Sequence, residues 1–316
     1  MQRKRKKTVA ILVPLYNDSH RIPTFVAKVE EIQTKISKGI ALKILFVDDG
    51  SADGPIKVAK KLKSKIPVCM IVLSRNFGKE AALTAGLDHF IGDGVILIDV
   101  DLQDPIELVP KLIDVWLTED KEVVLARRSI KGGEQNFRRK TSRLYLKFLK
   151  QISGLDFPSD VGETRFMSAK VVREINRLRE NQRFVRGLMT WVGFEPGFVD
   201  FERRESPEPS RFTKRKLISL ALSGVFSFSL APIRLITVLG VISLLISLCL
   251  ALVLIVLRIN DVVTLPGYSS TLFILLMFSS VQILSIGVIG EYLGRTFLEA
   301  KNRSIYVVSS KNEFRN

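Results

Sequence analysis

Two carboxylates stand two residues apart at the end of an apolar run near residue 100. Asp99 and Asp101 close the run Val95–Val100, and Gln103 follows two residues later. Because residues i and i+2 of a strand point the same way, both acids can face one ligand. Two neighbouring carboxylates are costly without a cation, and a hard divalent metal, Mg²⁺ or Mn²⁺, prefers such oxygen ligands. The pattern predicts a site for a metal and a diphosphate, although acids at a strand end are also typical of helix caps.

The acids belong to a series of short apolar runs whose spacing predicts βαβ units and a mainly parallel sheet. Each run ends in polar residues, and in open α/β sheets the ligand lies outside the carboxyl ends of the strands. We therefore expect the polar clusters to meet in one crevice. The runs are Val9–Leu15, Ile44–Val47, Val68–Leu73 and Val95–Val100, and the polar residues that end them are Asn17 and Asp18, Asp48 and Asp49, Arg75 and Asn76, and Asp99 and Asp101.

The rest of the first 210 residues continues this α/β pattern. We expect a helix at 105–117, a strand at 122–126, a helix at 169–179 and a last strand at 198–202. A basic segment at 138–143 opens another expected helix. The fold class is thus a Rossmann-type, mainly parallel α/β domain over residues 8–210, preceded by a basic tail at 1–7 that we expect to stay in the cytoplasm.

Two long apolar segments follow the predicted α/β domain. Leu235–Leu257 is 23 residues without a charge, and residues 272–292 begin with 19 uncharged residues. Each is long enough to cross the roughly 30 Å hydrocarbon core as a helix. A basic, amphipathic juxtamembrane segment is expected at 211–234, a short outer loop at 258–271 and a tail at 293–316. Because basic residues flank the pair of spans, the positive-inside rule predicts a multi-pass plasma or inner membrane protein with the catalytic domain and both termini in the cytoplasm.

The chain is strongly basic, with a net charge of +16. Such a charge calls for an anionic partner, which could be nucleic acid, a lipid surface or a phosphorylated substrate. Nucleic acid is one reading, since this charge suffices for non-specific phosphate binding. The basic residues lie beside the apolar segments and at the N-terminus, however, where anionic lipid explains them more simply. We therefore expect a lipid bilayer as partner and no nucleic acid.

Four motifs occur in a fixed order along the chain. They are Pro14-Leu15-Tyr16-Asn17, Val47-Asp48-Asp49-Gly50-Ser51, Ser74-Arg75-Asn76-Phe77-Gly78-Lys79 and Asp99-Val100-Asp101-Leu102-Gln103-Asp104-Pro105. With this set the chain resembles glycosyltransferase family 2, and within it the polyprenyl-phosphate sugar transferases: dolichyl-phosphate mannose synthases and bacterial undecaprenyl-phosphate glucosyltransferases. The resemblance covers nearly the whole chain and implies a GT-A-like fold, a nucleotide-sugar donor, a polyisoprenyl phosphate acceptor and, by analogy, a tetramer.

The resemblance also implies roles for individual residues. The nucleotide-sugar site would comprise Pro14, Tyr16, Asn17, Asp49, Asn76, Lys79, Asp99 and Gln103, the metal would be held by Asp99, Asp101 and Gln103, the lipid phosphate by Arg127, Arg139, Ser142, Arg203 and Arg211, and the reacting centre would be served by Asp101, Glu163 and Arg165.

Glu163 is a departure from the family pattern, which usually has an aspartate in the sequence Gly-Asp-Phe-Arg. Asp18 and Arg211 also differ from the common Glu and Lys. A phosphate monoester is already largely dianionic at neutral pH, so its attack needs charge screening more than a strong base. We expect direct displacement with inversion at the anomeric carbon, with Glu163 positioning or assisting.

The expected function is transfer of a hexose, from UDP-glucose rather than another donor, to undecaprenyl phosphate for cell-envelope glycan modification. A GDP-mannose-dependent polyprenyl-phosphate mannose synthase and a catalytically degenerate nucleotide-sugar scaffold stay open as alternatives. A processive polysaccharide synthase is disfavoured, because the chain has Arg183-Phe184-Val185-Arg186 in place of a Gln-x-x-Arg-Trp motif and only two predicted spans.

Overall fold

The structure is a computed structural model that describes residues 6–37, 39–129, 150, 158, 160–181, 183–202, 231–259 and 267–314. The described residues fall into two compact units. The first comprises those within 1–147, 155–211 and 304–316, and the second those within 148–154 and 212–303. Each unit is described by itself.

The first unit is built on an eight-stranded mixed sheet with the strand order β7-β5-β6-β4-β1-β2-β3-β8. β1 pairs in parallel with β2 and β4, β2 with β3, and β5 with β7. β6 runs antiparallel to both β4 and β5, and β8 runs antiparallel to β3. The strands are β1 (Lys7–Leu15), β2 (Ile40–Asp48), β3 (Val68–Leu73), β4 (Gly94–Leu97), β5 (Val123–Arg128), β6 (Val161–Ser168), β7 (Pro196–Phe201) and β8 (Val308–Phe314).

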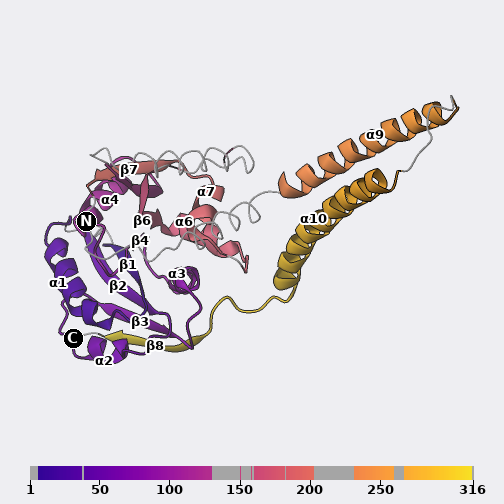
Figure 1. The fold of residues 1–316 in the computed structure, drawn as a ribbon. Helices are drawn as coiled ribbons and strands as arrows, with labels where there is room; N and C mark the ends of the chain where they lie inside the picture. The colour runs from indigo at the N-terminus through magenta and orange to yellow at the C-terminus, as the bar shows by residue number, and fades with distance from the viewer. Residues whose placement is uncertain are drawn as a thin grey trace. The chain divides into compact units, whose positions relative to one another are not determined.

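The sheet is covered on both faces, which explains why its central strands are apolar throughout. Alternate residues of β1 enter two different cores: Val9 and Ile11 pack in one, and Ala10 and Leu12 in the other. Helices on opposite sides close these cores (Figure 1). The helices of the first core are α1 (Ile22–Gln33), α2 (Pro55–Lys60) and α4 (Leu108–Thr118), those of the second are α3 (Lys79–Asp88), α6 (Ala169–Arg177) and α7 (Val185–Trp191), and a 3-10 turn, η1 (Ser19–Arg21), precedes α1.

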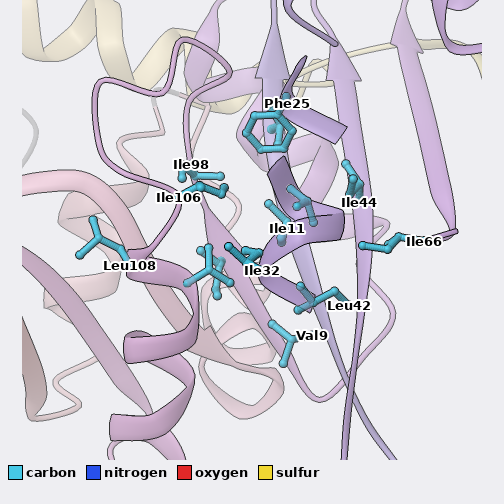
Figure 2. Close-up of a cluster of buried hydrophobic side chains, with 14 of the residues drawn as sticks. Val9, Ile11, Phe25, Ile32, Leu42, Ile44, Ile66, Ile98, Ile106 and Leu108 are labelled. Carbon is cyan, nitrogen blue, oxygen red and sulfur yellow. The ribbon is translucent and has the colours of Figure 1, made fainter. Parts of the chain in front are cut away.

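The first core joins segments that are far apart in the sequence. Phe25 of α1 packs with Ile11 of β1 and Ile44 of β2, while Ile106 lies just before α4 and Leu108 is its first residue (Figure 2). Phe25 has no exposed surface and stacks edge-on against the ring of Phe46. Burial of one such side chain is worth about 1.5–3 kcal/mol. This core therefore holds the ends of β1, β2 and β4 in a fixed relation.

Most of the predicted elements are confirmed, with small shifts at their ends. The third run matches β3, and β4 ends at Leu97, three residues before the predicted end. The prediction that 198–202 is the last strand is wrong, because β8 follows it near the C-terminus. β6 and α7 were not predicted either. The sheet is therefore mixed, with parallel strands in the majority.

β8 places part of the expected C-terminal tail inside the first unit. Its residues pair with β3 from Val68↔Phe314 to Leu73↔Val308. Just before it, the Tyr306 hydroxyl donates to Asp88 Oδ2 at 2.9 Å. Arg179 also donates to both oxygens of Asp88, at 3.0 and 2.9 Å. The pKa of the Tyr306 hydroxyl is strongly raised, because burial and the Asp88 charge disfavour its ionised form. Tyr306 thus fixes the entry to β8 at the end of α3.

The second unit contains two long helices, α9 (Ala231–Ile259) and α10 (Tyr268–Ala300). Within the described residues, one stretch is long and apolar enough by composition to cross a membrane, Met277–Ala300 of α10. It overlaps the second predicted span at 272–292. The first predicted span, at 235–257, coincides with α9 and stays a prediction. Residues 211–230 of the predicted juxtamembrane segment and 260–266 of the predicted outer loop lie outside the described residues.

Replacing Tyr306 by Phe should destabilise the first unit by about 1–2 kcal/mol, because Asp88 loses one hydrogen bond to a charged acceptor. The chain's two tryptophans, Trp116 and Trp191, both lie in this unit, so tryptophan fluorescence during urea unfolding reports on it alone. Tyr16→Phe is the control, since Tyr16 is half exposed. An unchanged unfolding midpoint in Tyr306→Phe would show that the hydroxyl bond contributes nothing.

Candidate functional site

The candidate site lies where β4 ends and α3 begins. Asp99 follows β4, and its Oδ2 accepts a 2.8 Å hydrogen bond from the ammonium of Lys79, the first residue of α3. The same ammonium lies 3.6 Å from Glu163 Oε2. Lys79 therefore bridges two carboxylates that are 64 residues apart in the sequence. The structure brings together three of the predicted site residues here.

The antiparallel pairing of β6 with β4 explains why Glu163 reaches this site. Leu97 is the register partner of Arg165. Asp99 lies two residues beyond Leu97, after the end of β4, and Glu163 lies two residues before Arg165 in β6, so the antiparallel direction brings them to the same level. Because β6 was not predicted, this pairing could not be read from the sequence. The sequence signal for β6 is weak, because only Val161, Phe166 and Met167 of Val161–Ser168 are apolar, although every residue except Glu163 is buried in the structure.

Asp104 fixes the start of β6 against the turn that follows Asp99 and Asp101. Its Oδ2 accepts from the backbone N–H of Thr164 at 3.1 Å and from the Thr164 hydroxyl at 2.9 Å, and both side chains are buried. A Cβ on Gly162 would lie 2.9 Å from the same oxygen, so glycine leaves room for this contact. Asp104 was seen only as part of a motif in the sequence. Its carboxylate is a structural brace that orients Glu163.

Arg165 is the buried member of the site, with 3% of its surface exposed. It donates to the backbone carbonyl oxygen of Glu163 at 3.0 Å, and its Nη2 lies 3.5 Å from Glu163 Oε2. Partial burial alone would raise the pKa of Glu163, but Lys79, Arg165, Arg186 and Arg128 together hold it below its usual value. Glu163 is consequently a carboxylate at neutral pH.

At Asp99, in contrast to Glu163, the effect of burial on the pKa outweighs the effect of the nearby cation. Desolvation raises its pKa, and Lys79 offsets only part of that effect. Asp101 is partly buried, and its Oδ1 accepts from the backbone N–H of Gln103 at 3.1 Å. Leu102, which lies between Asp101 and Gln103, has a left-handed φ of 55°. This conformation costs energy for a residue other than glycine and is typical of functional turns. The turn keeps both acids near the end of β4.

The Asp49 carboxylate holds the loop that leads into α3. Its two oxygens accept from the backbone N–H groups of Phe77 and Gly78, at 2.7 and 2.9 Å. Next to it, Gly50 has a φ of 71°, and a Cβ there would overlap the backbone of Arg75. Asp49 is 3% exposed, so its described contacts are structural, and its predicted role toward the nucleotide stays a prediction.

Asn17 ties together the loops after β1 and β2. Its backbone N–H donates to the Ser51 hydroxyl at 2.9 Å, and its side-chain oxygen accepts from the N–H of Ala52 at 2.9 Å. Pro14 is partly buried within β1, whereas Tyr16 is 50% exposed at its end. The Tyr16 ring is therefore accessible to a nucleoside base, and Asn76 is exposed as well.

The predicted lipid-phosphate residues are described only in part. Arg127 donates to both oxygens of Asp200, at 2.7 and 3.0 Å, and its guanidinium stacks on Phe198. Arg128 lies 3.7 Å from Asp104 and so beside the site. The role predicted for Arg127 stays a prediction, and Arg128 becomes a second candidate because it is the one near Asp104. The other four predicted residues, Arg139, Ser142, Arg203 and Arg211, lie outside the described residues.

No group of three or more His, Cys, Asp or Glu side chains arranged for a metal occurs in the part of the chain that the structure describes. The predicted ligands Asp99, Asp101 and Gln103 are oxygen donors nonetheless, and Asp99 and Asp101 lie close together just after β4. The Lys79 ammonium already contacts one oxygen of Asp99. Asp99 and Asp101 therefore have the chemistry to hold a hard divalent cation.

Comparison with known proteins supports one family. Residues 10–175 match the family described as glycosyl transferase family 2. The chain is 39% identical over 303 residues to an uncharacterized glycosyltransferase of Synechocystis sp., covering 95% of this chain and 94% of that protein. It is 38% identical over 305 residues to the bactoprenol glucosyl transferase of Shigella phage SfX, covering 96% and 99%. Mannosyl-3-phosphoglycerate synthase from Rubrobacter xylanophilus is 16% identical, with coverage of 69% and 73% and a TM-score of 0.46, which is too distant to bear on function. The chain belongs to glycosyl transferase family 2 and is a glycosyltransferase.

Proposed function

We propose that the protein transfers a hexose, with glucose from UDP-glucose favoured, to the phosphate of a polyisoprenyl lipid such as undecaprenyl phosphate. The observation that carries this proposal is the likeness to a bactoprenol glucosyl transferase along almost the whole of both chains. The site agrees with it, because carboxylates and cations alternate where a sugar diphosphate and an anionic acceptor would meet.

The acceptor supplies its own nucleophile. A phosphate oxygen attacks the anomeric carbon, the new C–O bond forms as the bond to the nucleotide diphosphate breaks, and the configuration inverts. Two anions must approach each other for this to happen, so Lys79 and Arg165 would screen their repulsion. Glu163, held as a carboxylate, would orient these cations and the acceptor. The protein needs no covalent intermediate.

Asp99, Asp101 and Gln103 would hold Mg²⁺ or Mn²⁺ in the proposed reaction. Bound there, the cation would neutralise negative charge on the departing nucleotide diphosphate. Lys79 would stay close to the donor, because its ammonium lies 2.8 Å from Asp99. Pro14, Tyr16 and Asn17 would line the nucleoside, with the accessible ring of Tyr16 against the base.

We further propose that α9 and α10 both cross the membrane and return the chain to the cytoplasm. α10 supports this by its apolar stretch Met277–Ala300, and α9 by its 23 uncharged residues from Leu235 to Leu257. A lipid acceptor would then be reached from the same bilayer. β8 agrees with a cytoplasmic C-terminus, because it pairs with β3 of the catalytic unit. A homotetramer is proposed by analogy alone.

The direct test uses the full chain in detergent with radiolabelled UDP- and GDP-sugars, undecaprenyl phosphate, and Mg²⁺ or Mn²⁺. Label from UDP-glucose should enter the organic phase, and a chelator should abolish the transfer. Label from GDP-mannose alone would replace the proposed donor. Nucleotide-sugar binding without transfer from any donor would favour the degenerate scaffold instead.

Asp101→Asn should lower the transfer rate by about 100-fold or more, because a metal-binding carboxylate contributes several kcal/mol to charge stabilisation. The side chain keeps its shape, so urea unfolding should be nearly unchanged. Asp114→Asn, on the exposed face of α4, is the matched control and should keep full activity. Equal rates for the two variants would remove Asp101 from the site.

Glu163→Gln should lower kcat by about ten-fold or more while donor affinity changes little, because it removes a charge that orients Lys79 and Arg165. Glu163→Asp restores the residue usual in the family and should retain most of the activity. Steady-state kinetics combined with calorimetry of UDP-glucose binding measures both quantities. If Gln reduces donor binding but leaves kcat intact, Glu163 belongs to the donor site alone.

A further inference from the structure

The carboxylate of Glu80 reaches from α3 to the start of α7. Glu80 follows Lys79 in the first turn of α3, and its Oε2 accepts a 2.8 Å hydrogen bond from the backbone N–H of Val185. Val185 is the first residue of α7 and is 1% exposed. One hydrogen bond therefore joins two helices through residues that are 105 positions apart in the sequence.

The start of α7 needs an acceptor from elsewhere in the fold. The first N–H groups of a helix have no partner within the helix, and a Ser, Thr, Asp or Asn just before it usually accepts from one of them. The residue just before α7 is Phe184, whose side chain has no oxygen that could accept such a bond. A buried N–H without a partner is costly. Glu80 supplies the acceptor for Val185 from another helix.

The first turn of α3 serves the candidate site and α7 together. Consecutive side chains on a helix point about 100° apart, so Lys79 and Glu80 face different neighbours. The Lys79 ammonium lies 2.8 Å from Asp99 and 3.6 Å from Glu163, while Glu80 binds the start of α7. A displacement of this turn would therefore disturb the ion pairs of the site and the start of α7 at once.

Two further hydrogen bonds hold the segment that leads into α7. Arg183, which is 6% exposed, donates from Nη2 to the Ile175 carbonyl oxygen of α6 at 2.7 Å. Arg186, in the first turn of α7, donates from Nη2 to the Pro158 carbonyl oxygen at 3.0 Å. Neither of these bonds reaches α3. The bond from Val185 to Glu80 ties the segment to the helix that carries Lys79.

We propose that Glu80 is a positioning residue for the transfer reaction, because it holds the first turn of α7 in place beside Lys79. This inference rests on the proposed transfer function and goes beyond it, since Glu80 would act through Lys79 and α7 without touching a substrate. The reacting groups of such a transfer must be closely aligned, and a small displacement by a distant change can cost a large factor in rate. Loss of the Glu80 bond should therefore lower kcat more than substrate affinity.

The test compares the full-length wild type with Glu80→Ala, Glu80→Gln and, as the matched control, Glu174→Ala. Glu174 lies on α6 and pairs locally with Arg177. Glu80→Ala should lower kcat by about ten-fold or more, while KM for UDP-glucose changes by less than about two-fold. Glu80→Gln keeps an oxygen that can accept from Val185, so its kcat should lie within about three-fold of the wild type. Glu174→Ala should behave as the wild type.

These kinetics separate positioning from a purely structural role. A bond that only stabilised the fold would lower the melting temperature and leave kcat of the folded protein unchanged. The proposal is overturned if Glu80→Ala keeps the wild-type kcat, or if Glu80→Gln loses as much activity as Glu80→Ala. If Glu80→Ala does not fold, Glu80→Asp is used. Its shorter side chain keeps the charge but reaches Val185 poorly, so kcat should fall by about three-fold or more, and an unchanged kcat overturns the proposal.

Hydrogen exchange of the full chain tests the link between the helices without turnover. In Glu80→Ala, exchange should rise together in residues 79–82 and 185–191, while residues 22–33 of α1 keep the wild-type rate. In Glu80→Gln all three regions should stay near the wild type. A rise confined to residues 185–191 would overturn the proposal, because Lys79 would then be held without Glu80. If the wild type transfers no sugar, the transfer function fails, and this exchange pattern still decides whether Glu80 links the two helices.

Discussion

This site depends on side chains of opposite charge that are packed together at one end of the sheet. A carboxylate near the end of a buried strand loses much of its hydration, and the raised pKa of Asp99 records that cost. Lys79 supplies the nearest opposite charge and is shared with Glu163. The Lys79 ammonium offsets part of the burial cost of Asp99 and lowers the pKa of Glu163. The backbone must therefore bring β4, β6 and α3 together within a few ångströms.

The fold meets this requirement by using other carboxylates as braces. Asp49 binds two backbone N–H groups at the entrance of α3, Asp104 binds the backbone and hydroxyl of Thr164 on β6, and Asp88 receives Tyr306 and Arg179 at the far end of α3. Asp49 and Asp104 in this way satisfy donors that would otherwise be costly to bury. α3 is consequently fixed at both ends, so Lys79 is positioned before any substrate binds. Such preorganisation is how electrostatic catalysis gains most of its effect.

The parallel part of the sheet could be predicted from the sequence, because an apolar run followed by polar residues is typical of a buried strand that ends at a binding site. β1, β3 and the acids after β4 could be placed in that way. β6 and β8 could not, since both pair antiparallel with strands distant in the sequence and no short turn marks their register. For the same reason the contact between Glu163 and Lys79 could not be predicted from the sequence. Arg127 and Arg128 are adjacent, and only the pairing of β5 shows which of them approaches Asp104 and which binds Asp200.

Lys79 and Asp99 hold each other in the free enzyme through their 2.8 Å contact. A double-mutant cycle with Lys79→Met and Asp99→Asn, followed by tryptophan fluorescence during urea unfolding of the full chain, measures that interaction. We predict that the two substitutions are not additive, with a coupling energy of about 0.5 kcal/mol or more, because each single change leaves the other charge without its partner. Additivity within about 0.3 kcal/mol would show that the two side chains do not stabilise each other.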